Sequence, residues 1–451
     1  MNADFLLTSP LAKRLYSEVA RDLPIIDYHN HLAVSGISKN AKPENIAKLW
    51  VTSDPYKHRA MRILGVPEKY ITGDSSDFEK FEVWYTSLPR LIGNPLFDWS
   101  QIELSTVFDF ELLPFGDAHS VWAELNSRLS GMSARDILGK FNIEYSAPCA
   151  SLCDDLSPFD ITSGLCPSLR GDDLLSPTQE LITKLEALTK KGISTLPDYL
   201  SAIDLRLGDF KSCGCVFADH ALDNGFVYAD DDGENCNRFS LLISGETLCV
   251  ADKKKLRSSI LKSLMSLYAG HGFAVQLHVG AERYTSTRLR TLAGAAGGFA
   301  AAGSNVDVNS LTRLFDDVEK EAPGLPRIML FTLNPTDNAV MATLCGSYSK
   351  DGEEALVTQG PAWWWCDHYT GICDMLESFM CHSVLSTFIG MTTDSRSLLS
   401  FVRHDYFRRV LCEWISNMVS KNRLPEDFDL LAETVSRICY QNAKRVLGCK
   451  N

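Results

Sequence analysis

The sequence predicts an α/β protein built as a (β/α)8 barrel. Eight short apolar or β-branched runs recur along its 451 residues, and eight is the number of strands that a closed parallel barrel needs. Segments with helical periodicity separate most of the runs, an alternation that favours a parallel sheet. No G-x-G-x-x-G follows the first run, so no nucleotide cofactor is expected. The expected strands are residues 23–28, 143–151, 161–166, 214–219, 273–279, 327–333, 355–359 and 386–391.

The segment between the first two runs is too long for one barrel helix. Residues from about 32 to 140 contain several helical patterns, so we expect a helical insertion subdomain after the first strand, lying over the barrel mouth. Loops that follow strands are where barrels of this class carry function. The whole chain, residues 1–451, is expected to form this single barrel with its insertion.

Composition narrows the classes of partner and the compartment. The net charge of −13 argues against a nucleic-acid partner, which needs a basic face. No apolar run approaches the roughly 20 residues that span a bilayer, so no membrane partner is expected. The 14 cysteines are scattered without zinc-finger spacing, and the first 20 residues lack an apolar signal-peptide core. We therefore expect a cytoplasmic protein.

The strongest local signal is PIIDYHNHL at residues 24–32, where an apolar strand ends in His29-x-His31. Alternate side chains of a strand point the same way, so both imidazoles are expected to face the barrel interior. Two neutral imidazoles that converge on one point are typical of a divalent metal site. The alternative is a pair of polar residues that merely end the strand.

A divalent metal also favours an anionic ligand, and the segment GMTTDSR supplies Asp394 after the eighth run. The first and last strands are neighbours in a closed barrel, so Asp394 can face His29 and His31; a helix N-cap is the competing role. His220 and His278 also follow expected strands. Each is a candidate metal ligand or proton-transfer group, and a structural role is equally compatible with the sequence.

Several arginines follow expected strands at the same end of the barrel. Arginine binds carboxylates bidentately and stays charged, so this group indicates an acidic small-molecule substrate. The run PAWWWCD at residues 361–367 offers tryptophans, among them Trp364, that can wall a pocket or stack on a sugar; core packing is the alternative. The arginines expected at the substrate are Arg170, Arg283, Arg396 and Arg445.

With these motifs in place, the sequence resembles the uronate isomerases, also called glucuronate isomerases, of the amidohydrolase superfamily. The resemblance runs through nearly the whole chain, and the block TDSRSLLSFVRHDYFRR at residues 393–409 is close to diagnostic. The other matching blocks are PIIDYHNHL at 24–32, KHRAMR at 57–62, ITGDSSDFEKF at 71–81, ADH at 218–220, QLHVGAER at 276–283, TLNPTDNAVMATL at 332–344 and ICYQNAKR at 438–445.

The resemblance implies a distorted TIM barrel that isomerises D-glucuronate to D-fructuronate and D-galacturonate to D-tagaturonate. It also implies one divalent metal, most often zinc, held by His29, His31 and Asp394, and a homo-oligomeric assembly. Arg170 and Arg396 become substrate-binding candidates by the same match, with Arg396 pairing with the substrate carboxylate.

One departure from the family pattern concerns the insertion. The family usually has Asp-His-Tyr-Lys-Trp-Arg where this chain has DPYKHR at residues 54–59, so Pro55 replaces a histidine. Proline cannot transfer a proton; either His58 takes over, or the substrate differs or activity is reduced. Tyr56 lies where a family tyrosine contacts the sugar.

We expect Asp394 to act as the base of an enediolate route, with Tyr56 or His58 as the hydroxyl proton shuttle.

Two alternatives remain open. The superfamily mostly hydrolyses C–N, C–O or P–O bonds, so a metal-dependent hydrolase with another acidic substrate is the first. A uronate-binding protein that has lost catalysis is the second.

Overall fold

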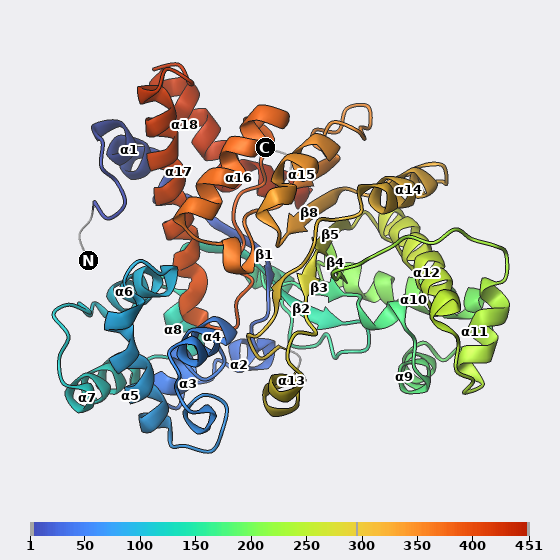
Figure 1. Ribbon diagram of the computed structural model, residues 1–451, viewed down its shortest axis with the longest axis horizontal. Coiled ribbons are helices and arrows are strands. Elements are labelled where there is room, and N and C mark those ends of the chain that lie inside the picture. The colour runs from blue at the N-terminus through green and yellow to red at the C-terminus, as the bar shows by residue number, and fades with distance from the viewer. Residues whose placement is uncertain (1–3, 295, 449–451) are drawn as a thin grey trace.

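The computed structural model describes residues 4–294 and 296–448 of the chain. At its centre lies a parallel sheet of seven strands in the order β1-β2-β3-β4-β5-β8-β9, and a separate antiparallel pair joins β6 to β7. Helices surround the sheet (Figure 1). The strands are β1 (Ile25–Asn30), β2 (Ile143–Ser151), β3 (Ser168–Arg170), β4 (Phe217–Leu222), β5 (Ala274–Val279), β6 (Ala281–Glu282), β7 (Ala301–Ala302), β8 (Ile328–Thr332) and β9 (Val357–Gln359).

Helices alternate with the strands of the seven-stranded sheet from β3 onward, as the sequence pattern predicts. Helices α9 and α10 lie between β3 and β4 along the chain, α11 and α12 between β4 and β5, and α15 between β8 and β9. Parallel neighbours need such crossover connections. The α-helices are α1 (Pro10–Leu15), α2 (Val34–Ser38), α3 (Ile46–Trp50), α4 (Pro55–Ile63), α5 (Asp77–Ser87), α6 (Pro95–Phe108), α7 (Ala118–Leu129), α8 (Ala134–Leu138), α9 (Gln179–Thr189), α10 (Leu196–Ser212), α11 (Asn235–Ile243), α12 (Val250–His271), α13 (Thr287–Ala293), α14 (Val308–Glu319), α15 (Asn338–Leu344), α16 (Tyr369–His382), α17 (Val402–Ser420), α18 (Phe428–Ser436) and α19 (Asn442–Val446).

The sheet curves so strongly that its first and fifth strands touch. The side-chain amide of Gln276 on β5 donates to the carbonyl of Tyr28 on β1 at 3.1 Å, and the ring of His278 lies 4.7 Å from that of His29. Apolar side chains from several strands fill the concave side, and all are buried: Ile26, Tyr28, Tyr145, Ala147, Phe217, Met329 and Phe331. The site at the strand ends therefore rests on a packed interior.

Helices α2 to α8 lie between β1 and β2 along the chain. Figure 1 shows most of them gathered on one side of the sheet, away from α9 to α12. Their packing includes Trp50 and Trp84, both fully buried, and a buried ion pair of 3.2 Å between Lys57 and Glu103. In the described part of the chain, no helix is both long enough and apolar enough to cross a membrane.

Two expected strands are wrong. Residues 161–166 form a 3-10 turn at Ile161–Ser163, capped by Asp160, and Gly164 then takes a φ of 72° that ends any extended run; the strand itself comes later, as β3. Residues 386–391 likewise form no strand, because a 3-10 turn covers Leu385–Thr387 and Gly390 has a φ of 80°.

The segment after Gly390 nevertheless lies against β1. The N–H of Asp394 donates to the carbonyl of His29 at 3.0 Å, and the N–H of His31 donates to the carbonyl of Ser395 at 2.8 Å. Ahead of these two bonds, the hydroxyl of Thr392 accepts from the N–H of His29 at 2.9 Å, where a backbone carbonyl would act in a regular ladder. A side chain thus replaces part of the expected backbone pairing.

Asp27 fastens residues 392–395, which we call the closing segment, to β1. Its fully buried carboxylate accepts from the N–H of Thr393 at 2.6 Å and from the hydroxyl of Thr392 at 3.0 Å, and it lies 3.2 Å from His404 Nε2. Burial alone would raise the pKa of Asp27, but its bonds with His404 and Thr393 hold that pKa below its usual value.

We predict that Asp27→Ala lowers the free energy of unfolding by about 3–5 kcal/mol at neutral pH, because it leaves buried partners unpaired. Since the folded-state pKa of Asp27 is depressed, its stabilisation is present at neutral pH and is lost as pH falls through that pKa. Urea denaturation measures the change, with the exposed Asp22→Ala as control. An equal loss in both variants would contradict the assignment.

Candidate active site

The histidine pair lies at the end of β1, with His29 in the strand and His31 just after it, and the strand is locally irregular there. Asp27 pairs with Ser146 of β2, but Asn30 pairs with Pro148, so three steps on β1 match two on β2. This bulge lets Tyr28 and His29 both face the concave side. His29 is buried, whereas the His31 side chain is 22% exposed, so His31 opens toward solvent.

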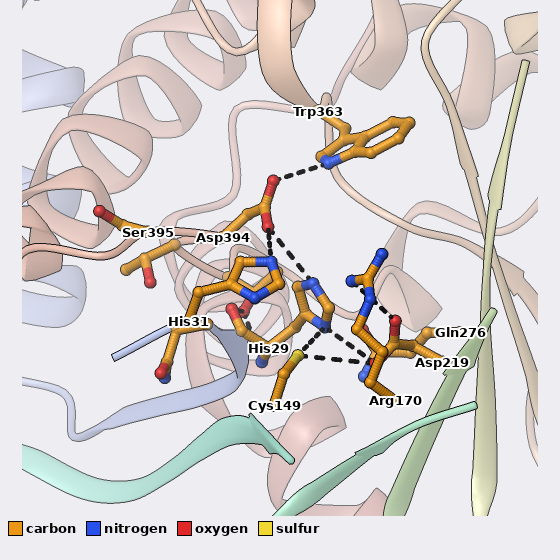
Figure 2. A network of polar contacts seen from close by, with 12 residues as sticks. His29, His31, Cys149, Arg170, Asp219, Gln276, Trp363, Asp394 and Ser395 are labelled. Atoms are coloured by element: carbon orange, nitrogen blue, oxygen red, sulfur yellow. Dashed lines mark hydrogen bonds and ion pairs between the residues drawn. The ribbon is translucent and has the colours of Figure 1, made fainter. Parts of the chain in front are cut away.

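Asp394 faces both imidazoles, as the sequence predicts. Its Oδ1 lies 3.3 Å from His29 Nε2 and 3.1 Å from His31 Nε2, while its Oδ2 accepts from the indole N–H of Trp363 at 2.8 Å (Figure 2). The backbone of Asp394 has a φ of 45°, uncommon for a residue other than glycine. Such strained residues cluster at functional sites.

The two separations from Asp394 Oδ1 are those expected between ligands of one divalent cation. Nitrogen and oxygen atoms bound to one ion at about 2.0–2.1 Å lie roughly 3.0–3.4 Å from one another, and the two separations from Asp394 Oδ1 fall in that range. Burial alone would lower the pKa of His29 and of His31, but Cys149 and Asp394 raise both above their usual values. The pocket therefore favours positive charge beside these rings.

Cys149 and Asp219 lie on the opposite edge of the His29 ring, and neither was predicted from the sequence. Cys149 Sγ is 3.6 Å from His29 Nδ1 and 3.6 Å from Asp219 Oδ1 (Figure 2). Arg170 of β3 lies 3.2 Å from Asp219 Oδ2. Possible ligand atoms lie within 4.8 Å of one another in two sets, His29 with His31 and Cys149, and His29 with Asp219 and His278.

The two further candidate histidines have different surroundings. His278 lines the site, and its buried Nε2 has no hydrogen-bond partner among the described residues; burial and the neighbouring His29 hold its pKa well below the usual value. His220 is not at the site. Strand alternation turns it away from the side that Asp219 faces, and its Nε2 lies 2.9 Å from the hydroxyl of Tyr268 on α12.

Helix α4 carries one of the two expected proton shuttles to the site. Asp54 caps this helix by accepting from the N–H of Tyr56 at 2.9 Å, and Pro55 occupies its first turn. Pro55 and Tyr56 both line the main cavity. His58 does not; it is buried elsewhere on α4, with Asp54, Arg62 and Glu68 as its charged neighbours. The expectation that His58 replaces the family histidine is therefore not supported by its position.

The main cavity has a volume of about 510 Å³ and opens over Asp394 and the two histidines. Arg170, Arg283, Arg396 and Trp364 all line it. Arg170 pairs with Asp172 at 2.7 Å and Arg283 with Asp223 at 2.7 Å, but Arg396 has no ion-pair partner among residues 4–294 and 296–448.

Arg445 lies elsewhere, contrary to the expectation. It pairs with Glu354, which precedes β9, whereas the tryptophans of the cavity follow β9. Since the strands are parallel, Arg445 belongs to the opposite end of the sheet.

Known proteins with this sequence pattern share a function. A family model described as glucuronate isomerase matches residues 1–447. The uronate isomerase of Bacillus pumilus is 36% identical over 459 residues, covering 99% of this chain and 96% of that protein. That of Clostridium acetobutylicum is also 36% identical, over 457 residues, covering 98% of this chain and 97% of that protein.

Solved structures agree with the sequence matches. The crystal structure of uronate isomerase from Thermotoga maritima superimposes with a TM-score of 0.91 at 27% identity, over 99% of each chain. Glucuronate isomerase from Caulobacter crescentus has the same fold, with a TM-score of 0.89 at 23% identity over 100% of this chain and 97% of that one. The chain, matched along nearly its whole length, therefore belongs to the glucuronate isomerase family, whose members are intramolecular oxidoreductases.

Proposed function

We propose that this protein isomerises D-glucuronate to D-fructuronate, and D-galacturonate to D-tagaturonate, by proton transfer through an enediolate. The observation that carries the proposal is the approach of Asp394 Oδ1 to both His29 Nε2 and His31 Nε2 in a cavity that Arg396 also lines. A carboxylate, a place for a cation and a guanidinium without an ion-pair partner in the described part of the chain are what a charged, polyhydroxylated substrate needs.

His29, His31 and Asp394 are the proposed ligands of one divalent ion, zinc by preference. When bound, such an ion supplies Lewis-acid polarisation of substrate oxygens. Cys149, Asp219 and His278 are the other possible ligands that lie within reach of His29. His278, buried and held neutral by its surroundings, is available as a further ligand or proton carrier.

Asp394 is the proposed base that takes the proton from C2 and returns it to C1. Tyr56, which lines the same cavity, is placed to carry the hydroxyl proton between the C1 and C2 oxygens. Arg396, with Arg170, Arg283 and Trp364 around it, would hold and orient the substrate, and much of their value would come from positioning.

We further propose that the closing segment completes a distorted (β/α)8 barrel in place of a regular eighth strand, and that residues 32–140 form an insertion over its mouth. The hydrogen bonds between Asp394 and His29 and between His31 and Ser395 support closure. A homo-oligomer in the cytoplasm is the proposed working form, on the ground of family resemblance and the scattered cysteines.

A mixture of each hexuronate with the protein in D2O, followed by NMR, tests the reaction. We expect a ketose product without net addition of water, carrying deuterium at C1 because the transferred proton exchanges with solvent. Hydrolysis of another acidic compound, with both hexuronates unchanged, would instead favour the hydrolase alternative. Tight binding of the uronates without turnover would indicate a binding protein.

We predict that Arg396→Ala raises KM for D-glucuronate by about tenfold to a hundredfold, because the substrate carboxylate loses a charge-assisted hydrogen-bond partner. Steady-state kinetics measure the change, and the metal content is expected to stay the same. Arg445→Ala is the matched control, since that arginine pairs with Glu354 at the far end of the sheet. An unchanged KM in Arg396→Ala would remove this residue from substrate binding.

A further inference from the structure

A buried arginine joins the closing segment to the helical insertion. Arg403, on α17, is only 2% exposed, and its Nη1 donates to the carbonyl of Thr393 at 2.7 Å. Its guanidinium carbon lies over two aromatic rings, 4.5 Å from the ring centre of Tyr56 and 4.2 Å from that of Trp99. A second buried residue, Asp367, lies 3.8 Å from it and is its ion-pair partner.

The contact with Thr393 bears directly on Asp394. Thr393 precedes Asp394, whose φ of 45° is strained, and such a conformation persists only where its surroundings impose it. Arg403 holds the carbonyl of Thr393, while Asp27 accepts from its N–H at 2.6 Å. Both polar groups of the preceding residue are therefore fixed.

The contact with Tyr56 fixes the other side of the site. The Tyr56 ring packs against the Arg403 guanidinium and two tryptophans. Its centre lies 6.1 Å from the ring centre of Trp99 and 5.3 Å from that of Trp365. Tyr56 and Asp367 line one small pocket together with His29 and Asp394. The guanidinium thus lies over the tyrosine ring while one of its N–H groups donates to the closing segment.

We propose that the Arg403–Asp367 pair is a positioning device that holds Tyr56 and Asp394 in register for proton transfer. The proposal rests on the isomerase function above. A planar guanidinium can stack on an aromatic ring while it donates in its own plane, and a lysine ammonium cannot do both. Positioning therefore requires the planar guanidinium and not only its positive charge.

Arg403→Lys tests this proposal. We expect kcat for D-glucuronate to fall by about tenfold to a hundredfold, with KM changed less than about twofold, because a displacement of about 1 Å has such effects. Zinc content is expected to be retained. Asp367→Asn, which is nearly isosteric, is expected to lower kcat in the same way. It is the second test of the proposal if Arg403→Lys folds poorly.

Arg408→Lys is the matched control. Arg408 is also buried on α17, but its guanidinium donates to the carbonyls of Leu23 and Pro24 at 2.9 Å, ahead of β1. Its replacement is expected to cost stability without lowering kcat. Unchanged kcat in both Arg403→Lys and Asp367→Asn, or an equal fall in Arg408→Lys, would overturn the proposal.

The visible spectrum of the cobalt-substituted protein separates this proposal from the proposed function. If Arg403 positions Asp394, Arg403→Lys shifts the cobalt d–d bands and Arg408→Lys leaves them as in the parent protein. The shift is expected whatever the substrate is, so absence of hexuronate turnover by the parent protein would refute the isomerase function alone. Unshifted bands in Arg403→Lys would refute the positioning role.

Discussion

Replacing Asp394 by asparagine is expected to lower the turnover of D-glucuronate by about a thousandfold. Asparagine keeps the size of the side chain but cannot accept the C2 proton, and general acid–base catalysis contributes about 10²–10⁴-fold. The amide also puts no negative charge beside His29 Nε2 and His31 Nε2, now 3.3 and 3.1 Å from Asp394 Oδ1. Steady-state kinetics and a metal assay measure the two losses separately.

Asp98→Asn is the control for that variant. Asp98 is a partly buried carboxyl on α6 whose pKa burial raises to about 6, and it lines neither pocket of the site. Its replacement is expected to leave turnover within about twofold. Turnover of Asp394→Asn within tenfold of the parent protein would reject Asp394 as the base.

The double variant His29→Asn/His31→Asn is expected to lose the cation altogether, from about one ion per chain to almost none, and with it all measurable turnover. Both imidazoles have raised pKa values, chiefly through Cys149 and Asp394 acting against burial. Protons therefore compete with the ion, and we expect metal affinity in the parent protein to fall as pH falls through those pKa values.

His220→Asn is the matched control for the histidine pair. This histidine is as buried as His29 but contacts Tyr268 on the outer side of β4. Elemental analysis after dialysis is expected to find the same metal content in His220→Asn as in the parent protein. A double variant that retains a full equivalent of metal would show that the ion lies elsewhere.

The parallel sheet could be predicted because each buried strand is a short apolar run bounded by turns, and helical periodicity marks the segments between. The two wrong strand predictions both involve glycines. Gly164 and Gly390 adopt positive φ values inside apolar stretches, and the apolar pattern does not report backbone conformation. The bulge in β1 was equally hidden, since it depends on how β1 and β2 pair.

The placement of the site residues could likewise be predicted only in part. The proximity of His29, His31 and Asp394 could be predicted because a local motif marks the first two and the segment after Gly390 brings the third beside them. His220 was misplaced because β4 begins three residues later than expected, which puts His220 within the strand and on its outer face. Asp219, one residue earlier, faces the site instead; strand alternation was the available signal, but it required the correct register.

Distant contacts account for the remaining differences. Arg445 pairs with Glu354, which lies far from it in the sequence, and no sequence motif predicts this pair. Arg403 falls in the block at residues 393–409 that carries the family resemblance, but its contacts with α4, the closing segment and Asp367 could not be predicted from that block.

The central claim is tested most directly by anomalous diffraction at the zinc edge from crystals grown with zinc. We predict one peak about 2.0–2.2 Å from His29 Nε2, His31 Nε2 and Asp394 Oδ1. A peak on the opposite edge of the His29 ring, bonded to Cys149 Sγ and His29 Nδ1 with Asp394 left free, would contradict the account.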